Sequence, residues 1–220
     1  MLDRCNHHDL SMLLYSFAKN ASYDRNIQQL FESIGNHIVA QRRLNDFKPQ
    51  ELSNIVWAFA KIGYHHKDLF ETVANHIIGH NVLVANYNEQ EIAMIIWAFS
   101  KSRSFHVEFF ELLTDHILQR DDLDDFTFIS LNNIVWGLNQ FTTPPKELME
   151  KVLNAASKHN DLGNLARLAK KMFPDTKEIC WDQSCTTCGR HHINDIKLME
   201  VLLQRRLERM YEEQKGMLML

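Results

Sequence analysis

The chain has little glycine and proline, no net positive charge and no long apolar run. Seven glycines and four prolines in 220 residues exclude a collagen-like sequence and disfavour an all-β chain rich in turns. Because the net charge is −4, any binding of nucleic acid must use a local basic feature rather than bulk charge. No apolar run approaches the roughly 18 residues of a membrane span, so we expect no membrane partner.

Targeting signals and catalytic motifs are also lacking. The first twenty residues match neither a signal peptide nor a transit peptide, so we expect either a protein that is not imported or a leader outside this sequence. There is no glycine-rich phosphate loop, no His-Glu-x-x-His pair and no nucleophile within a motif. We therefore expect a non-catalytic protein without a small-molecule substrate.

What the sequence does contain is a ten-residue string that recurs along the chain. It reads LSMLLYSFAK from Leu10, LSNIVWAFAK from Leu52, IAMIIWAFSK from Ile92 and LNNIVWGLNQ from Leu131. A second string follows each copy, beginning with LFESIGNHIV from Leu30, and successive second strings start 39 or 40 residues apart. Two strings that keep one period of about forty residues predict a repeat array.

Both strings have the apolar spacing of a helix, i, i+3, i+4 and i+7. A capping box from Asn88 to Glu91 and Pro49 at a first helical position mark helix starts. One helical hairpin cannot bury its apolar face alone, so hairpins must stack. We expect an all-α fold, with an α-solenoid of about four to five stacked hairpins over residues 1–174. Residues 175–220 are expected to form a Cys/His segment and a capping helix.

In such a stack, equivalent positions of successive repeats form columns. A column of lysines, interrupted by Gln140 in the fourth copy, can follow the phosphates of single-stranded RNA. A lysine at a helix end also offsets the helix dipole. The third position of the string varies between methionine and asparagine. Its amides are candidates for reading bases, and the alternative is that they are ordinary surface residues. The lysine column is Lys19, Lys61, Lys101 and Lys171, and the amides are Asn54, Asn133 and Asn164.

Two further columns consist of aromatic side chains and of histidine side chains. Tyr15, Trp57, Trp97 and Trp136 recur within the apolar string, so we expect them in the core, with stacking on bases as the alternative. Histidines recur in the second helix, at His37 and its equivalents. They are too far apart to share one metal, and we expect them to be structural.

Three of the four cysteines lie close together near the C-terminus. Cys180, Cys185, Cys188 and His191 have residue types and a spacing that suit tetrahedral zinc. The C-x4-C-x2-C spacing also matches the first ligands of a [2Fe–2S] site, for which Cys5 is a candidate fourth ligand. If the segment holds a metal, zinc is the preferred cofactor and an iron–sulfur cluster the less favoured one; the alternative to both is a set of unmetallated thiols.

The string from Leu52, with the L-F-E-x-x-x-x-H-I pattern of the next helix, resembles the heptatricopeptide and octotricopeptide repeats of organellar proteins. It also resembles the repeats of FAST-kinase-like and RAP-domain proteins. The resemblance covers Leu10 to Lys171 and is most specific from Ile55 to Phe59. It implies an α-solenoid that binds RNA in a mitochondrion or, alternatively, a plastid. The RAP domain itself has no counterpart here.

The resemblance implies an organellar RNA-binding protein. Most concretely, we expect a mitochondrial ribosome component that contacts ribosomal RNA and neighbouring ribosomal or ribonucleoprotein subunits. The alternatives are a factor that stabilises or processes transcripts, and a protein–protein scaffold without RNA. Net acidity and the acidic run Asp121–Asp125 favour the scaffold, although such a run is usually a solvated turn.

Overall fold

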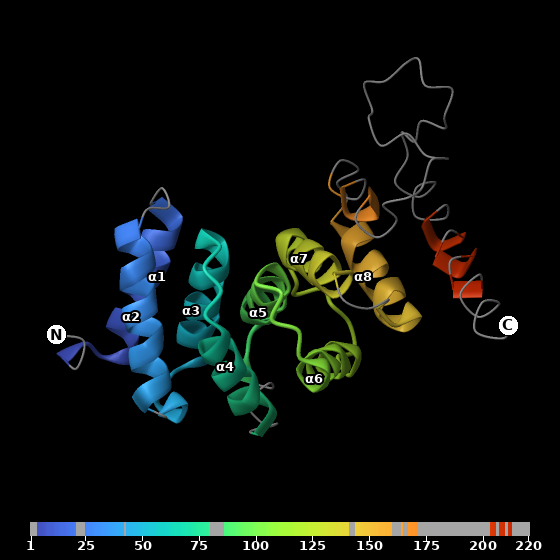
Figure 1. Cartoon of the computed structure of the whole chain (residues 1–220). Coiled ribbons are helices and arrows are strands. Elements are labelled where there is room, and N and C mark those ends of the chain that lie inside the picture. Colours follow the sequence, from blue (N-terminus) through green and yellow to red (C-terminus); the bar gives the residue numbers. More distant parts are fainter. Residues whose placement is uncertain are drawn as a thin grey trace, which may run out of the picture. The chain divides into compact units, whose positions relative to one another are not determined.

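The computed structural model describes residues 4–20, 25–41, 43–79, 86–140, 144–159, 164, 167–170, 203–205, 207–209 and 211–212. All regular elements within these ranges are helical, and no strand occurs there, which confirms the all-α prediction for this part of the chain (Figure 1). The elements are α1 His7–Asn20, α2 Arg25–Gln41, η2 Leu44–Asp46, α3 Pro49–Ile62, α4 Lys67–Gly79, α5 Glu89–Lys101, α6 Val107–Leu118, α7 Phe128–Leu138 and α8 Lys146–Lys158. The predicted Cys/His segment and the predicted boundary at 174/175 lie outside the described residues.

The chain forms two compact units, Met1–His116 and Ile117–Leu220. The first unit holds α1 to α5 and most of α6, and the second holds α7 and α8. The change of unit therefore falls inside α6.

In the first unit, the first helices of successive repeats, α1, α3 and α5, pack side by side (Figure 1). Small side chains at their contacts allow the helix axes to approach closely. The second helices α2 and α4 also pack on each other. The buried small residues recur at repeat positions and are Ser11, Ala18, Ser53, Ala60, Ala93 and Ser100.

Phenylalanines join the row of first helices to the row of second helices. Phe31 of α2 lies 5.0 Å, ring centre to ring centre, from Phe59 of α3, and Phe70 of α4 lies 5.0 Å from Phe99 of α5. Phe99 also lies 4.5 Å from Phe109 of α6. All of these rings are fully buried or nearly so. The second helix of one hairpin thus packs on the first helix of the next, as a repeat array requires.

The helix starts follow the predicted signals. The Asn88 side chain accepts a hydrogen bond from the Glu91 N–H at 2.9 Å, and the Glu91 carboxylate accepts one from the Asn88 N–H at 2.9 Å. The capping box is therefore confirmed, and Pro49 is the first residue of α3 as predicted. Phe47 and Tyr87, one residue before the caps, are buried and fix the entry of the chain into each helix.

In the second unit, α7 packs on α8. Leu131 and Ile134 of α7 and Leu148 and Val152 of α8 are fully buried. Their spacing along each helix, i and i+3 or i+4, places them on one face.

Candidate nucleic-acid interface

An aromatic ladder crosses the three first helices of the first unit. The Tyr15 ring of α1 lies 5.0 Å from Trp57 of α3, and Trp57 lies 6.4 Å from Trp97 of α5, each pair being tilted by 36°. These residues are 42 and 40 positions apart in sequence. The repeat register predicted from the sequence is therefore the register in which α1, α3 and α5 pack.

The rings of this aromatic ladder are half-buried rather than part of the closed core. The expectation of core positions is therefore wrong for Tyr15, Trp57 and Trp97. The physical reason is the direction of packing. The apolar faces of α3 and α5 that carry Phe59 and Phe99 turn toward the second helices, whereas the ladder runs along the row of first helices itself.

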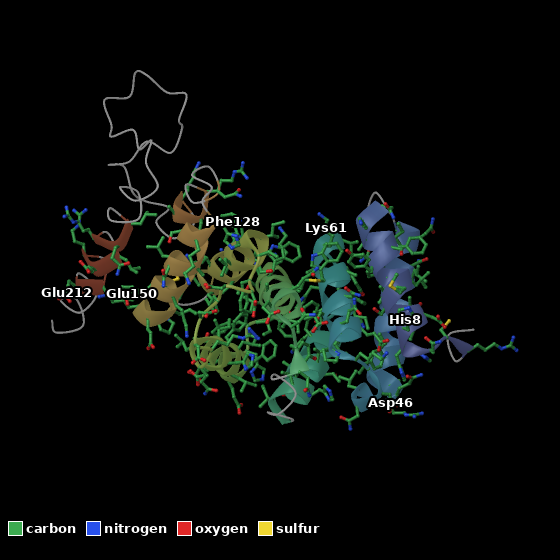
Figure 2. All side chains as sticks on the ribbon, turned by 180° about the vertical axis from the view of Figure 1, so that it is seen from behind. His8, Asp46, Lys61, Phe128, Glu150 and Glu212 are labelled. Atoms are coloured by element: carbon green, nitrogen blue, oxygen red, sulfur yellow. The ribbon has the colours of Figure 1, made fainter. Side chains whose placement is uncertain are left out.

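A row of lysines lies one helical turn beyond the ladder. Lys19, Lys61 and Lys101 each follow their ladder ring by four residues, and residues four apart share a helix face. All three side chains are exposed at the C-terminal ends of their helices (Lys61 is labelled in Figure 2). The Lys19 ammonium lies 6.0 Å from the centre of the Tyr15 ring. We call Lys19, Lys61 and Lys101 the lysine row.

A row of uncharged side chains, three amides and one methionine, lies on the other side of the ladder. Asn54 of α3 and Met94 of α5 are half-buried one turn before Trp57 and Trp97, and Gln50 and Gln90 are exposed one turn further back. The side chains that reach the surface between Gln50 and Lys61, and between Gln90 and Lys101, include no carboxylate, because Glu51 and Glu91 are buried.

Sequence reasoning missed Gln50 and Gln90. They stand forty residues apart at the same repeat position, which was the signal that could have found them. As a result, α3 and α5 present the same series at the surface, from amide through aromatic ring to ammonium group.

The other predicted site residues belong to the second unit or lie outside the described residues. Asn133 of α7 and Asn164 belong to the second unit, and both are half-buried. The Asn164 side-chain oxygen accepts a hydrogen bond from Arg167 at 3.0 Å. Lys171 lies outside the described residues. The structure therefore brings together Lys19, Lys61, Lys101 and Asn54 of the predicted set.

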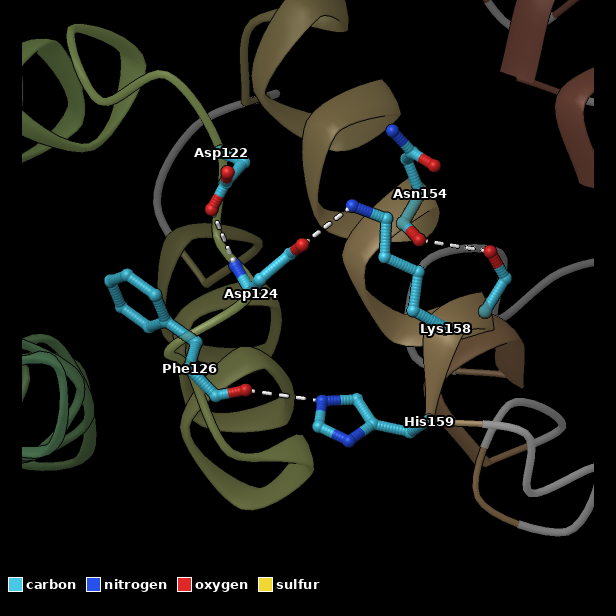
Figure 3. Close-up of polar contacts among 7 residues, drawn as sticks. Asp122, Asp124, Phe126, Asn154, Lys158 and His159 are labelled. Carbon is cyan, nitrogen blue, oxygen red and sulfur yellow. Dashed lines mark hydrogen bonds and ion pairs between the residues drawn. The ribbon is translucent and has the colours of Figure 1, made fainter.

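Residues at the end of α8, in the same unit, bind the loop that contains the acidic run Asp121–Asp125 (Figure 3). The Lys158 ammonium lies 2.7 Å from the Asp124 carboxylate, and this hydrogen-bonded carboxylate raises the pKa of Lys158 above its ordinary value. The His159 ring donates to the Phe126 carbonyl at 3.1 Å. Part of the negative charge of the run is therefore already paired.

A second lysine of α8 supports the same loop at its other end. The Lys151 ammonium donates to the Leu118 carbonyl at 2.9 Å and also to the Arg120 carbonyl. Leu118 is the last residue of α6 and Arg120 lies just after it, so neither carbonyl has an intrahelical partner. The loop is thus positioned by α8 at both ends.

The residues that the structure describes contain no group of three His, Cys, Asp or Glu side chains placed to hold a metal ion. Cys5 is half-buried and is not in a disulfide, and Cys180, Cys185, Cys188 and His191 lie outside the description. None of the described helices combines the length and apolarity needed to cross a bilayer.

No family model matches the chain, and no curated protein matches it significantly.

Proposed function

We propose that this protein is a non-catalytic RNA-binding helical-repeat protein, built as a solenoid of four to five hairpins. The single observation that supports RNA binding is the surface of α1, α3 and α5, where the aromatic ladder and the lysine row run in parallel. The organellar setting, most concretely a mitochondrial ribosome and its ribosomal RNA, rests on the repeat resemblance.

The lysine row suits a nucleic-acid backbone because its charges are free of acidic neighbours on α3 and α5. Helices in contact have axes about 8–10 Å apart, so the row offers one ammonium group at each helix step. Each phosphate that a lysine neutralises releases counterions, which makes binding weaken as salt rises. The row therefore supplies sequence-independent attraction despite the net charge of −4.

The ladder adds the second element of single-strand binding, an aromatic platform. Base stacking on such rings is worth about 1–3 kcal/mol per base and tolerates every base. The rings of Tyr15, Trp57 and Trp97 are half-buried, so an edge or face of each ring remains open to solvent. Asn54, one turn away from the Trp57 ring, can donate to or accept from a base edge.

The test is the salt dependence of binding to a single-stranded RNA of about 20 nucleotides, longer than a typical site of roughly 4–16 nucleotides. The double variant Lys61→Ala with Lys101→Ala should bind more weakly. Its slope of log affinity against log salt should be flatter by about 1.4, since each lost phosphate contact contributes about 0.7. Fluorescence anisotropy at several salt concentrations measures both quantities.

A matched control carries the same charge change elsewhere. Lys146 lies 3.4 Å from the Glu150 carboxylate, and Lys158 lies 2.7 Å from that of Asp124. The double variant Lys146→Ala with Lys158→Ala should leave the slope nearly unchanged. Equal slopes for the two double variants would show that the lysine row has no special role, and the proposal would fail.

The two other functions differ from this proposal in what accompanies the protein. A factor that stabilises or processes transcripts would co-purify with messenger RNA rather than with ribosomal subunits. A scaffold would co-purify with proteins and no RNA. Sequencing the RNA that co-purifies with the native protein separates the three cases.

A further inference from the structure

A hollow of about 400 Å³ opens in the first unit between α4 and the turn that precedes α6. Its volume falls in the range of about 300–1,000 Å³ that small-molecule sites occupy. We call it the α4–α6 hollow. Its walls include Phe70, Ala74, Phe99, Arg103, Ser104 and Phe105.

Two repeats differ at a turn position that lines the hollow. In the preceding hairpin, Tyr64 stands at the equivalent position, with its ring 6.0 Å from Phe59 and 6.2 Å from His66. Forty residues later the equivalent of Tyr64 is Ser104, which has no ring. The Ser104 hydroxyl instead lies 3.3 Å from Nδ1 of His65, at the rim.

A second difference at the same turn places a charged residue where the preceding repeat has glycine, in a backbone conformation that is unfavourable for residues other than glycine. Gly63 ends α3 in the left-handed region with φ 74°, and its repeat equivalent Arg103 adopts φ 54°. A non-glycine residue in this region costs roughly 1–2 kcal/mol. Strain of this kind is concentrated at functional sites, and here it holds a guanidinium group at the hollow.

The lining combines positive charge with aromatic surface. Lys67 and Arg103 outnumber the carboxylate of Glu71, and the imidazoles of His65 and His106 add further polar groups. Such a set of cations binds phosphate, and a guanidinium group does so with two parallel hydrogen bonds.

The aromatic surface is open to a planar ring. Phe105 is 44% exposed although its ring stacks on Phe110 at 5.8 Å. An exposed ring beside phosphate-binding cations matches the two halves of a nucleotide, its base and its phosphate.

From these contacts we infer that the α4–α6 hollow binds one nucleoside 5′-monophosphate unit. The base packs against Phe105, and the phosphate lies against Arg103 and Lys67. The unit is either a free nucleotide or one nucleotide of a bound RNA, and the RNA form rests on the proposed function. The hollow is distinct from the lysine row, since none of its lining residues belongs to that row.

Calorimetric titration of the whole protein with adenosine 5′-monophosphate, uridine 5′-monophosphate, inorganic phosphate and O-phosphotyrosine tests the inference. A nucleotide should bind more tightly than phosphate or phosphotyrosine. The variant Arg103→Gly restores the residue of the preceding repeat, so it should not lower the melting temperature. It should nevertheless weaken nucleotide binding by at least about tenfold.

Ser104→Tyr copies Tyr64 of the preceding repeat and should abolish nucleotide binding by filling the hollow. Ser104→Ala, which keeps the hollow open, should bind nearly as the natural protein does. Binding of phosphate alone as tightly as a nucleotide, tighter binding of phosphotyrosine, or nucleotide binding unaffected by Ser104→Tyr would each overturn the inference.

The two sources of the nucleotide are separated by competition. Single-stranded RNA that displaces adenosine 5′-monophosphate places an RNA nucleotide in the hollow, whereas independent binding assigns the hollow to a free nucleotide. RNA binding that depends on Lys61 and Lys101, with no nucleotide binding, would contradict this inference but would still support the proposed function. Nucleotide binding without RNA binding would support this inference and contradict the proposed function.

Discussion

The contact between Gly35 and His66 makes a sharp prediction about stability. Gly35 lies in the middle of α2 and faces the buried His66 ring. A Cβ added to Gly35 would lie 2.5 Å from Cδ2 and 2.7 Å from Nε2 of His66. Carbon atoms in contact are normally about 3.5–4.0 Å apart, so Gly35→Ala must displace the ring by about 1 Å.

The displaced ring has two hydrogen bonds to lose. The Leu69 N–H donates to Nδ1 of His66 at 3.2 Å, which caps the start of α4, and Nε2 donates to the Asn36 side-chain oxygen at 3.2 Å. Overpacking costs about 1–3 kcal/mol and a lost cap about 0.5–2 kcal/mol. The better helix propensity of alanine returns about 1 kcal/mol. We therefore expect Gly35→Ala to lower the free energy of unfolding by about 0.5–4 kcal/mol.

Urea denaturation followed by circular dichroism measures this loss. Gly79→Ala is the matched control, because a Cβ there meets nothing within 4 Å, and it should be neutral or slightly stabilising. The double variant Gly35→Ala with His66→Ala should lose less than the two single variants together, since the clash is then absent. A Gly35→Ala protein as stable as the Gly79→Ala protein would refute the reasoning.

Three further predictions concern stability. Because burial, with a contribution from the Glu91 carboxylate, raises the pKa of the Tyr87 phenol, the folded state keeps this proton after the unfolded chain has lost it. Below about pH 10 this group should not reduce the free energy of unfolding. Above about pH 10 the free energy of unfolding should fall by about 1.4 kcal/mol per pH unit. In urea titrations at several pH values, Tyr87→Phe should make this fall less steep. Lys151→Met should destabilise the second unit by about 1.5–3 kcal/mol because it removes a charged donor from the Leu118 carbonyl, and an unchanged thermal midpoint would contradict this. Asn88→Ala should cost about 1 kcal/mol by removing the cap of α5, whereas Asn88→Asp should cost little in the same melting experiment.

Much of the fold could be predicted because its signals are local. The capping box at Asn88 and Glu91 and the proline at Pro49 mark helix starts through neighbouring residues alone. The register of the first unit could also be predicted, since it repeats the sequence period. Trp57 and Trp97, forty residues apart, are in ring contact at 6.4 Å.

The remaining features depend on which side of a helix meets its neighbour. Apolar spacing places Phe59 and Trp57 on α3 but does not say that one ring is buried and the other half-buried. The hollow could not be predicted either, because the turn at which Ser104 stands in place of Tyr64 carries no motif. Similarly, the role of Gly35 depends on a residue 31 positions away.

The most direct test of the RNA-binding account is a map of the contacts that bound RNA makes. A single-stranded RNA containing 4-thiouridine can be crosslinked to the protein by light and the modified residues identified by mass spectrometry. The account predicts crosslinks at the aromatic ladder, on Tyr15, Trp57 or Trp97, that disappear in the Lys61→Ala and Lys101→Ala double variant. Crosslinks confined to residues outside α1, α3 and α5, or no crosslinked RNA at all, would contradict it.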